Sequence, residues 1–550
     1  MDGFKQKLLD SGFRGDVDDS PAAKDFYSHD ASLFEVKPQI IVFPKDSQDV
    51  QLLVGLAGSY KKKLSNLSLT ARSAGTDMSG GAINDSVIVN FNKYFTKIES
   101  VNAHSAQAQP GVFYRDFEKE TFKYKALMPS FPASRDLCTI GGMVANNSGG
   151  EKSLEYGKTE NFVKQLSVVL ADGKEYQVGP LKRIDLIKKM AQNDFEGSVY
   201  KKTFELIEAH YDKIKAAKPH VTKNSTGYNL WDVWDRETGI FDLTKLIVGS
   251  QGTLGLVTDI HFRLVPTYPY DGVLVCFMKN INDLGEIINT VLAHKPATFE
   301  SFDNYTLNLS IKFFPYFRKA IGWRGLFKLA VSLIPDALLL FRGIPKMILL
   351  IEFTGQSQRE VDDKIVSMNQ DLKHFKLEAT EDDDTEQKAW KFRIMRRESF
   401  NLLRKKVKDK HTAPFIDDLV VSPPYLVEFL PQLRKIIDKY GLLATVAGHM
   451  GDGNFHVIPL MKLEDKADRD KLLPAMKEVN NLVLKYKGSL SGEHNDGMIR
   501  GPWLEQMYGH QIVEIFREVK DIFDPKGILN PHKKAEANWD YSFRHIREHF

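Results

Sequence analysis

The chain has 550 residues, of which 42% are hydrophobic and 27% charged, and 75 Lys and Arg stand against 72 Asp and Glu. This composition is typical of a globular protein with about two to four domains, so disordered, collagen-like and coiled-coil classes are poor starting points. The formal net charge of +3 is too balanced to indicate a nucleic-acid partner.

The cysteine count limits the chemistry. Only Cys138 and Cys276 are present, which excludes a disulfide framework, an internal iron–sulfur cluster and a four-cysteine zinc site. The first ten residues lack the apolar core of a signal peptide. No stretch reaches the ~18 uncharged apolar residues that a membrane span needs. We therefore expect a cytoplasmic protein.

The first half of the chain mixes strands and helices. Residues 1–35 are polar and are expected to form a lead-in to a domain at 36–268. A strand is predicted at 40–43, followed by a helix in which apolar residues recur with helical spacing at 50–57. Further strands are expected at 87–89, 166–171 and 246–248. This mixture predicts an α+β fold.

A second block is predicted at 269–550. Strands at 273–278 and 348–351 are each followed by a helix, at about 282–293 and 358–373. This order predicts a sheet with helices packed on one face, again α+β. The block ends in helices at about 465–487 and 508–522.

Three glycine-rich loops lie beside predicted strands, at 72–82, 140–150 and 248–255. Glycines let backbone N–H groups converge, and such nests bind phosphate oxygens. A Walker A loop is excluded because Lys152 occupies its upstream glycine position, and no Gly-x-Gly-x-x-Gly opens a helix. The three loops together indicate a large phosphorylated cofactor that is held in another way.

These loops resemble the FAD-binding domain of the vanillyl-alcohol-oxidase family, also called the PCMH-type fold, over residues 30–265. The resemblance implies a domain of two subdomains that binds FAD. Gln251 departs from the glutamate usual in the family. The residues that the resemblance places against FAD are Ser73, Ala74, Gly75, Thr76, Asp77, Ser79, Pro132, Ser134, Thr139, Gly141, Gly142, Ala145, Ser148 and Val257.

The sharpest local signal is His449-Met450-Gly451-Asp452-Gly453-Asn454-Phe455-His456. The Gly-Asp-Gly-Asn segment is typical of a tight turn, and a hairpin there would bring both imidazoles to one point. Glu493 and His494 follow further along. Two imidazoles and a carboxylate are the ligands of a catalytic zinc-type site. Sequence spacing alone does not show whether these two segments meet.

Both segments resemble the C-terminal domain of FAD-linked oxidases of the D-lactate dehydrogenase, glycolate oxidase and D-2-hydroxyglutarate dehydrogenase group. The resemblance implies a substrate domain on a ferredoxin-like sheet, with a helical C-terminus. It also implies that His449, His456 and Glu493 bind Zn or Mn and that His494, neutral near pH 7, is the catalytic base. Asn495 replaces the family's usual glycine. The resemblance also implies that Asn530 lies near the flavin ring and that Arg393 pairs with the substrate carboxylate. Arg393 has an alternative interpretation, as part of a solvated helix face.

The implied reaction is the metal-assisted oxidation of a D-2-hydroxy acid to the 2-oxo acid, with hydride transfer to flavin N5. The D-2-hydroxyglutarate enzymes of the group carry polar residues near the positions of Arg397, Ile416 and Ile458. Two of these three are isoleucine here, which favours a D-lactate-like acid or a longer apolar one. Alternatives are D-2-hydroxyglutarate or glycolate oxidation, and ether-lipid synthesis like that of alkyl-glycerone-phosphate synthases. A further alternative is a protein that binds flavin but catalyses no reaction. Electrons would pass to a quinone, a cytochrome or an electron-transfer flavoprotein.

Residues 311–347 combine seven basic residues and one acidic residue with interleaved aromatic and leucine side chains. This pattern is typical of segments that lie on anionic bilayers, and equally of a pair of core helices. The sequence therefore allows peripheral binding to the inner face of a membrane through this segment.

Overall fold

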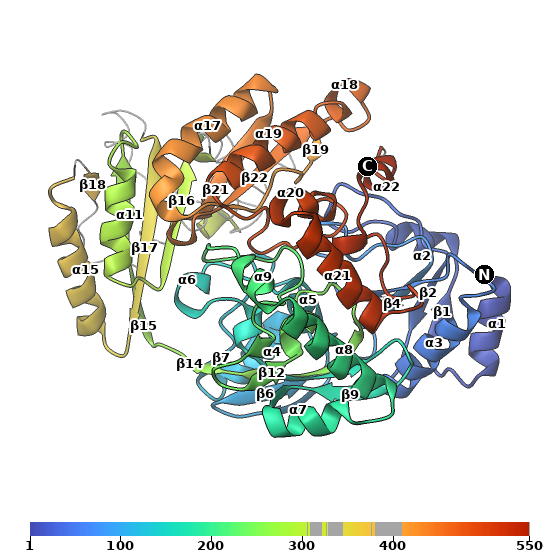
Figure 1. Ribbon diagram of the computed structural model, residues 1–550. Helices are drawn as coiled ribbons and strands as arrows, with labels where there is room; N and C mark the ends of the chain where they lie inside the picture. Colours follow the sequence, from blue (N-terminus) through green and yellow to red (C-terminus); the bar gives the residue numbers. More distant parts are fainter. Residues whose placement is uncertain are drawn as a thin grey trace.

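The computed structural model describes residues 1–304, 306–308, 322–325, 327, 345–375, 377–379 and 410–548. Figure 1 shows two N-terminal sheets on one side of the molecule and a larger sheet with its own helices on the other. The arrangement agrees with the predicted α+β fold. Two predictions, Arg393 and most of 311–347, lie outside the described residues.

The first sheet has the strand order β1-β2-β4-β3. Strands β2, β4 and β3 are parallel, whereas β1 joins β2 antiparallel. Its elements are α1 (Asp2–Asp10), β1 (Asp16–Asp18), α2 (Pro21–Phe26), β2 (Ile40–Phe43), α3 (Ser47–Tyr60), β3 (Leu69–Arg72) and β4 (Val87–Asn90). The expected lead-in is thus part of this layer, because β1 extends the sheet and Phe4 and Leu8 of α1 are fully buried.

The second sheet is antiparallel, in the order β5-β6-β13-β8-β9. Its strands are β5 (Ile98–Val101), β6 (Ser105–Ala108), β8 (Val163–Val169), β9 (Glu175–Val178) and β13 (Leu256–Arg263). The helices of this part are α4 (Tyr114–Phe122), α5 (Ile140–Asn146), α6 (Ser153–Tyr156), α7 (Arg183–Met190), α8 (Phe195–Ala209) and α9 (Tyr211–Ala216). Short pairings join β7 (Ala126–Leu127) to β14 (Val265–Pro266), and β12 (Ile240–Asp242) to β10 (Pro180–Lys182) and β11 (Trp234–Asp235).

The predicted strand at 246–248 is wrong, because this segment forms the short helix α10 (Thr244–Ile247). The Asp242 carboxylate accepts hydrogen bonds from the backbone N–H and the hydroxyl of Thr244, at 2.9 and 2.7 Å. Such a contact between an aspartate and the backbone two residues further on favours a turn over an extended strand. This local turn therefore overrides the β-branched character of Ile247 and Val248.

The third sheet is antiparallel and has the main order β18-β15-β17-β16-β21-β22-β19, with β20 also paired to β22. Its strands are β15 (Tyr270–Met278), β16 (Thr298–Asp303), β17 (Met347–Gly355), β18 (Leu377–Ala379), β19 (His411–Thr412), β20 (Leu419–Val420), β21 (Leu443–His449) and β22 (Asn454–Met461). Helix α11 (Leu284–Ala293) links β15 to β16, and α15 (Gln358–Leu372) links β17 to β18. These six elements have the strand order of the expected ferredoxin-like unit.

The two faces of this sheet have different environments. One face packs in a large core against α11, α15, α17 (Leu426–Lys439) and α19 (Leu472–Lys485). Since alternate side chains of a strand point to opposite faces, the other face carries a second set of residues. Several of these line a cavity, among them Thr298 and Glu300 of β16 and Leu350 and Glu352 of β17.

The end of the chain returns to the N-terminal part. The remaining helices are α18 (Lys466–Arg469), α20 (Leu504–Tyr508), α21 (His510–Phe523) and α22 (Trp539–Arg544). In Figure 1, α20 and α21 lie with the N-terminal sheets rather than with α11 and α15, and Phe516 and Val519 of α21 belong to the core of the second sheet. Leu529 then pairs with Leu69 of β3.

The described residues contain no helix that is both long and apolar enough to cross a membrane. Of the segment 311–347, only residues 322–325, 327 and 345–347 are described.

Candidate active site

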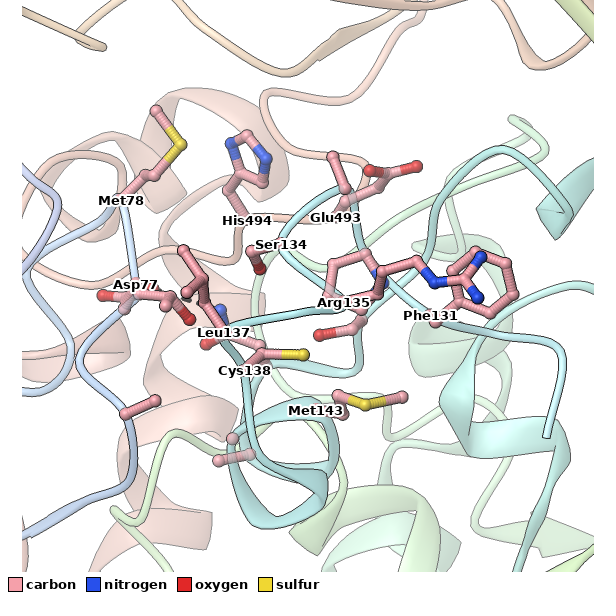
Figure 2. Close-up of a pocket in the computed structure, with 18 of the residues that line it drawn as sticks. Asp77, Met78, Phe131, Ser134, Arg135, Leu137, Cys138, Met143, Glu493 and His494 are labelled. Atoms are coloured by element: carbon pink, nitrogen blue, oxygen red, sulfur yellow. Dashed lines mark hydrogen bonds between the residues drawn. The ribbon is translucent and has the colours of Figure 1, made fainter. Parts of the chain in front are cut away.

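A cavity of about 940 Å³ is lined by residues of both halves of the chain. Its N-terminal side includes the glycine-rich loops and the segment 131–139, and its C-terminal side includes the face of the third sheet that carries Glu300 and Leu350. In Figure 2, Glu493 and His494 lie at the upper side of this cavity, Cys138 and Met143 at the lower side, and Asp77 and Met78 on the loop that borders it. The three loops and the His-Glu cluster therefore face a single site.

The loop at 73–78 offers unused hydrogen-bond donors to this cavity. The Asp77 carboxylate turns inward and accepts from the backbone N–H groups of Ser79 and Gly81, at 3.2 and 2.6 Å. The backbone N–H groups of residues 73–78 donate to no other residue in the part of the chain described here. Such a nest is suited to phosphate oxygens, so the loop fits the pyrophosphate of FAD.

Thirteen of the predicted FAD contacts line the cavity, and they come from the loops at 72–82 and 140–150, the segment just before the second loop, and β13. They are Ser73, Ala74, Gly75, Thr76, Asp77, Pro132, Ser134, Thr139, Gly141, Gly142, Ala145, Ser148 and Val257. The hydroxyl of Thr139 is buried there without a hydrogen-bond partner among the described residues. A buried polar atom of this kind is satisfied when a polar ligand fills the cavity.

Ser79 and Asn530 are not among the lining residues, although both were predicted to contact FAD. The Ser79 hydroxyl is 2.9 Å from Oδ2 of Asp77, and the Asn530 amide donates to the carbonyls of Gly81 and Gln251 at 2.9 and 2.6 Å. Their polar groups are used in holding loops together. Both residues therefore support the cavity wall from behind.

The two departures from the family pattern, Gln251 and Asn495, lie in one network. Nδ2 of Asn495 donates to the carbonyls of Asn146 and Gly249, at 3.1 and 2.9 Å. Oε1 of Gln251 accepts from the backbone N–H of Gly497 at 2.8 Å. Asn495 has φ +66°, which asparagine tolerates better than most residues. The network joins the loop after Glu493 to the glycine-rich loops.

The predicted hairpin brings the two histidines together. Strands β21 and β22 pair so that Ala447 is opposite His456 and His449 is opposite Asn454. Gly453 turns the chain with φ +64°, and a Cβ at this position would collide with the carbonyl oxygen of Val421. The turn thus needs glycine, as the sequence indicated.

Glu493 meets both imidazoles. Oε1 of Glu493 lies 3.3 Å from Nε2 of His449, and Oε2 lies 3.9 Å from Nε2 of His456. The three ligand atoms lie within 4.8 Å of one another, and all three side chains line the cavity. Two imidazoles and a carboxylate with an open side fit a divalent metal such as zinc. The structure therefore answers the question that sequence spacing left open.

Besides Glu493, each of the two histidines contacts a further carboxylate through its Nδ1 atom. Nδ1 of His449 is 2.6 Å from Oε1 of Glu300, and Nδ1 of His456 is 3.3 Å from Oδ1 of Asp417. In metal sites such partners fix the tautomer and leave Nε2 for the metal. Burial alone would lower the pKa of His449, but the Glu300 and Glu493 carboxylates together outweigh burial and raise this pKa to about 9.

The base candidate, His494, shares the same orienting carboxylate. Its Nδ1 lies 2.7 Å from Oδ2 of Asp417, and its ring stacks on that of His456 with 5.1 Å between centroids. Since His494 also lines the cavity, Nε2 is the nitrogen available to a molecule bound there.

The protonation state of His494 differs from the expectation of a neutral ring near pH 7. Burial would lower its pKa, but Asp417 and Asp418 outweigh burial and raise it to about 9 in the chain alone. A divalent cation nearby would oppose this shift, because like charge disfavours the imidazolium.

Asp418 holds the loop that carries Glu493 and His494. Its Oδ2 accepts from the backbone N–H groups of Glu493 and His494, at 2.9 and 2.8 Å, and from the Ser491 hydroxyl at 2.6 Å. Sequence reasoning missed Glu300, Asp417 and Asp418. The available signal was a charged residue inside an apolar run, as in Thr298-Phe299-Glu300-Ser301-Phe302 and Ile416-Asp417-Asp418-Leu419.

The two isoleucines that bear on substrate choice have different environments. Ile458 lines it, whereas Ile416 is packed in the core of the third sheet. Among the described lining residues the only Lys or Arg is Arg135, which pairs with Glu118 at 2.5 Å. Arg393, predicted to pair with a substrate carboxylate, lies outside the described residues.

Two family models match the chain: the FAD binding domain over residues 38–179 and the C-terminal domain of FAD linked oxidases over residues 269–534. D-2-hydroxyglutarate dehydrogenase of Pseudomonas putida is 27% identical over 96% of this chain and 51% of its own length. D-lactate dehydrogenase of Archaeoglobus fulgidus is 25% identical over 90% of both chains. The chain spans about half the length of the first of these relatives.

Two solved structures share the fold. That of p-cresol methylhydroxylase aligns with a TM-score of 0.67 at 15% identity over 98% of both chains. That of alkyldihydroxyacetonephosphate synthase aligns with a TM-score of 0.64 at 16% identity, over 97% of this chain and 85% of the other. The fold is thus that of PCMH-type FAD enzymes. With both domain models matched in order, the chain belongs to the FAD-linked oxidases.

Proposed function

We propose that this chain oxidises a D-2-hydroxy acid to the 2-oxo acid, with FAD as the hydride acceptor and a divalent metal, Zn or Mn, at His449, His456 and Glu493. One observation carries the proposal. The three ligand atoms converge within 4.8 Å in the cavity that the FAD loops also line. Relatives named for D-2-hydroxy acids support it.

The chain's own residues have distinct roles in this proposal. When bound, FAD supplies a two-electron acceptor and the metal supplies Lewis acidity toward the hydroxyl and carboxylate oxygens. In the neutral form of His494, Nε2 would accept the hydroxyl proton, with Asp417 holding the ring in place. Arg393, from outside the described residues, pairs with the substrate carboxylate.

The side chain of the substrate is proposed to be small or apolar, as in D-lactate. His456 and Ile458 stand two residues apart on β22, on the same face of the sheet, so their Cα atoms lie roughly 6–7 Å apart. A side chain directed along the sheet from the metal would thus meet Ile458. The alternatives, D-2-hydroxyglutarate and glycolate, are included as substrates in the experiment below.

The electron acceptor is proposed to be a quinone, a cytochrome or an electron-transfer flavoprotein. The two cysteines exclude an internal iron–sulfur relay within this chain. For a quinone, the basic and apolar segment 311–347 would bring the chain to the inner face of an anionic membrane. Absence of sedimentation with anionic liposomes at low salt would contradict this membrane contact.

The test of the reaction follows flavin absorbance under anaerobic conditions. The FAD-loaded protein is mixed with D-lactate, L-lactate, glycolate or D-2-hydroxyglutarate, with and without prior chelation. Bleaching by a D-acid that is lost on chelation and restored by zinc or manganese is expected. Absence of bleaching with every acid in metal-loaded protein would overturn the proposal and favour ether-lipid chemistry or a flavin-binding role.

A further inference from the structure

One buried lysine of the N-terminal part reaches the metal-ligand cluster. Lys223 lies between α9 and β11, outside both matched domain ranges, and is 1% exposed. Its Nζ is 2.6 Å from Oε1 of Glu493 and 2.9 Å from Oδ2 of Asp452, and it donates to the carbonyl of Gly150 at 3.2 Å. The ammonium thus joins the loop of Glu493 to the hairpin turn between the two histidines.

The residues beside Lys223 fix it in this place. The Thr222 hydroxyl donates to the carbonyl of Asp452 at 2.7 Å. The backbone N–H of Ser225 donates to the carbonyl of Ser491 at 2.9 Å, and its hydroxyl donates to the carbonyl of Gly492 at 2.9 Å. The segment around Lys223 is therefore bonded on either side to the two loops that carry the ligands.

The charges at this point favour an ordered carboxylate. A buried ammonium is tolerated only when it is paired, and Lys223 has two carboxylate partners. Since Asp452 balances the charge of Lys223, Glu493 contributes a net negative charge toward a cation. A carboxylate held by one oxygen has little freedom to rotate away from His449 and His456.

We propose that Lys223 is the positioning residue of the metal site: its ammonium, delivered from the N-terminal part, holds Glu493 in the pose in which it meets both imidazoles. The inference rests on the metal site of the proposed function. It assigns part of the ligand geometry to a residue that neither matched domain contains.

The experiment measures zinc affinity of the FAD-loaded protein by competition with a chromophoric chelator. The variant is Lys223→Met combined with Asp452→Asn, because removal of the lysine alone leaves Asp452 buried without a counter-charge. The matched control is Lys520→Met combined with Asp524→Asn. This ammonium–carboxylate pair is also buried, with Nζ of Lys520 at 2.6 Å from Oδ2 of Asp524, but Nζ of Lys520 donates to the carbonyls of Thr253 and Leu529, away from the two loops that carry the ligands.

We expect the double variant to retain FAD and to bind zinc about 10- to 100-fold more weakly than the wild type, the usual effect of removing a partner of a metal ligand. The control variant, Lys520→Met with Asp524→Asn, is expected to bind zinc with wild-type affinity. Unchanged or tighter binding by the double variant would overturn the role of Lys223 while leaving the metal site intact. Absence of stoichiometric binding of both zinc and manganese by the wild type would overturn both the role of Lys223 and the metal site.

Discussion

The carboxylate of Glu300 lies 2.6 Å from Nδ1 of His449, although the two residues are 149 positions apart in the sequence. Antiparallel pairing of β16 with β21 places them opposite each other on the cavity face of the sheet. The pair fixes which nitrogen of His449 faces Glu493. The sheet register, more than the hairpin motif, therefore determines the direction of this ligand.

This relationship predicts the effect of Glu300→Gln. The neutral amide keeps the shape of the side chain but loses the charge that orients the imidazole, so zinc affinity should fall about 10- to 100-fold. Chelator competition on the FAD-loaded protein measures the change. Thr298→Val, two residues earlier on the same face, is the matched control. Equal affinities for both variants would show that Glu300 does not orient His449.

Asn495 predicts an order of stability among three proteins. Asn495→Gly keeps a backbone suited to φ +66° but loses the side-chain bonds to Asn146 and Gly249, which should cost about 1–3 kcal/mol. Asn495→Ala loses the same bonds and adds the strain of a left-handed alanine, so it should be less stable still. Denaturant unfolding of the three proteins measures the order. An alanine variant as stable as the glycine variant would contradict the account.

Asp30 predicts a pH dependence of stability. Burial, reinforced by the nearby charge of Asp77, raises the pKa of Asp30 from 3.8 to about 7. Between these values the folded chain holds a proton that the unfolded chain releases, so the free energy of unfolding falls as pH rises through this window. Below pH 3.8 this contribution is fully present.

Asp30→Asn should make the slope between pH 4 and 7 smaller, because the amide does not titrate. Urea unfolding of the FAD-free protein at a series of pH values measures the slope. Asp2→Asn, at the exposed start of α1, is the control that should retain the wild-type dependence. A slope that is the same for Asp30→Asn and the wild type would contradict the raised pKa.

Ile458 predicts a change of substrate preference. An arginine at this position would place a cation about two strand residues from the metal ligand His456, within reach of a second carboxylate. We expect Ile458→Arg to raise the ratio of kcat/KM for D-2-hydroxyglutarate over D-lactate at least about tenfold, the effect of roughly 1.4 kcal/mol. Ile458→Leu should keep the wild-type ratio. If Ile458→Arg and Ile458→Leu changed the ratio of kcat/KM equally, the substrate side chain would not lie next to residue 458.

The parts of the structure that the sequence predicted are those set by local patterns. The helix at 50–57, the hairpin between His449 and His456 and the three glycine-rich loops each follow from spacing within a short window. The resemblance to FAD-linked oxidases added the order of the two domains, which the matched models confirm.

What the sequence did not reveal depends on contacts between distant segments. Glu300, Asp417 and Lys223 come from three separate segments, and only the register of the sheet and the seam between the two halves bring them to one site. The error at 246–248 has a local cause, because the Asp242 carboxylate holds a turn at Thr244, where α10 begins. The role of Arg393 stays a prediction.

The return of residues 528–530 to the first sheet has a consequence for synthesis. The backbone of Leu69 donates to the carbonyl of Ile528 at 2.7 Å and accepts from the N–H of Asn530 at 2.9 Å. The apolar residues of α21 also fill the second core. A nascent chain that has emerged only as far as β13 thus has both N-terminal sheets but lacks the helix that covers one of them. The apolar surface that α21 covers in the complete chain would be exposed in this nascent chain. Chaperones would therefore bind the nascent chain until translation is nearly complete.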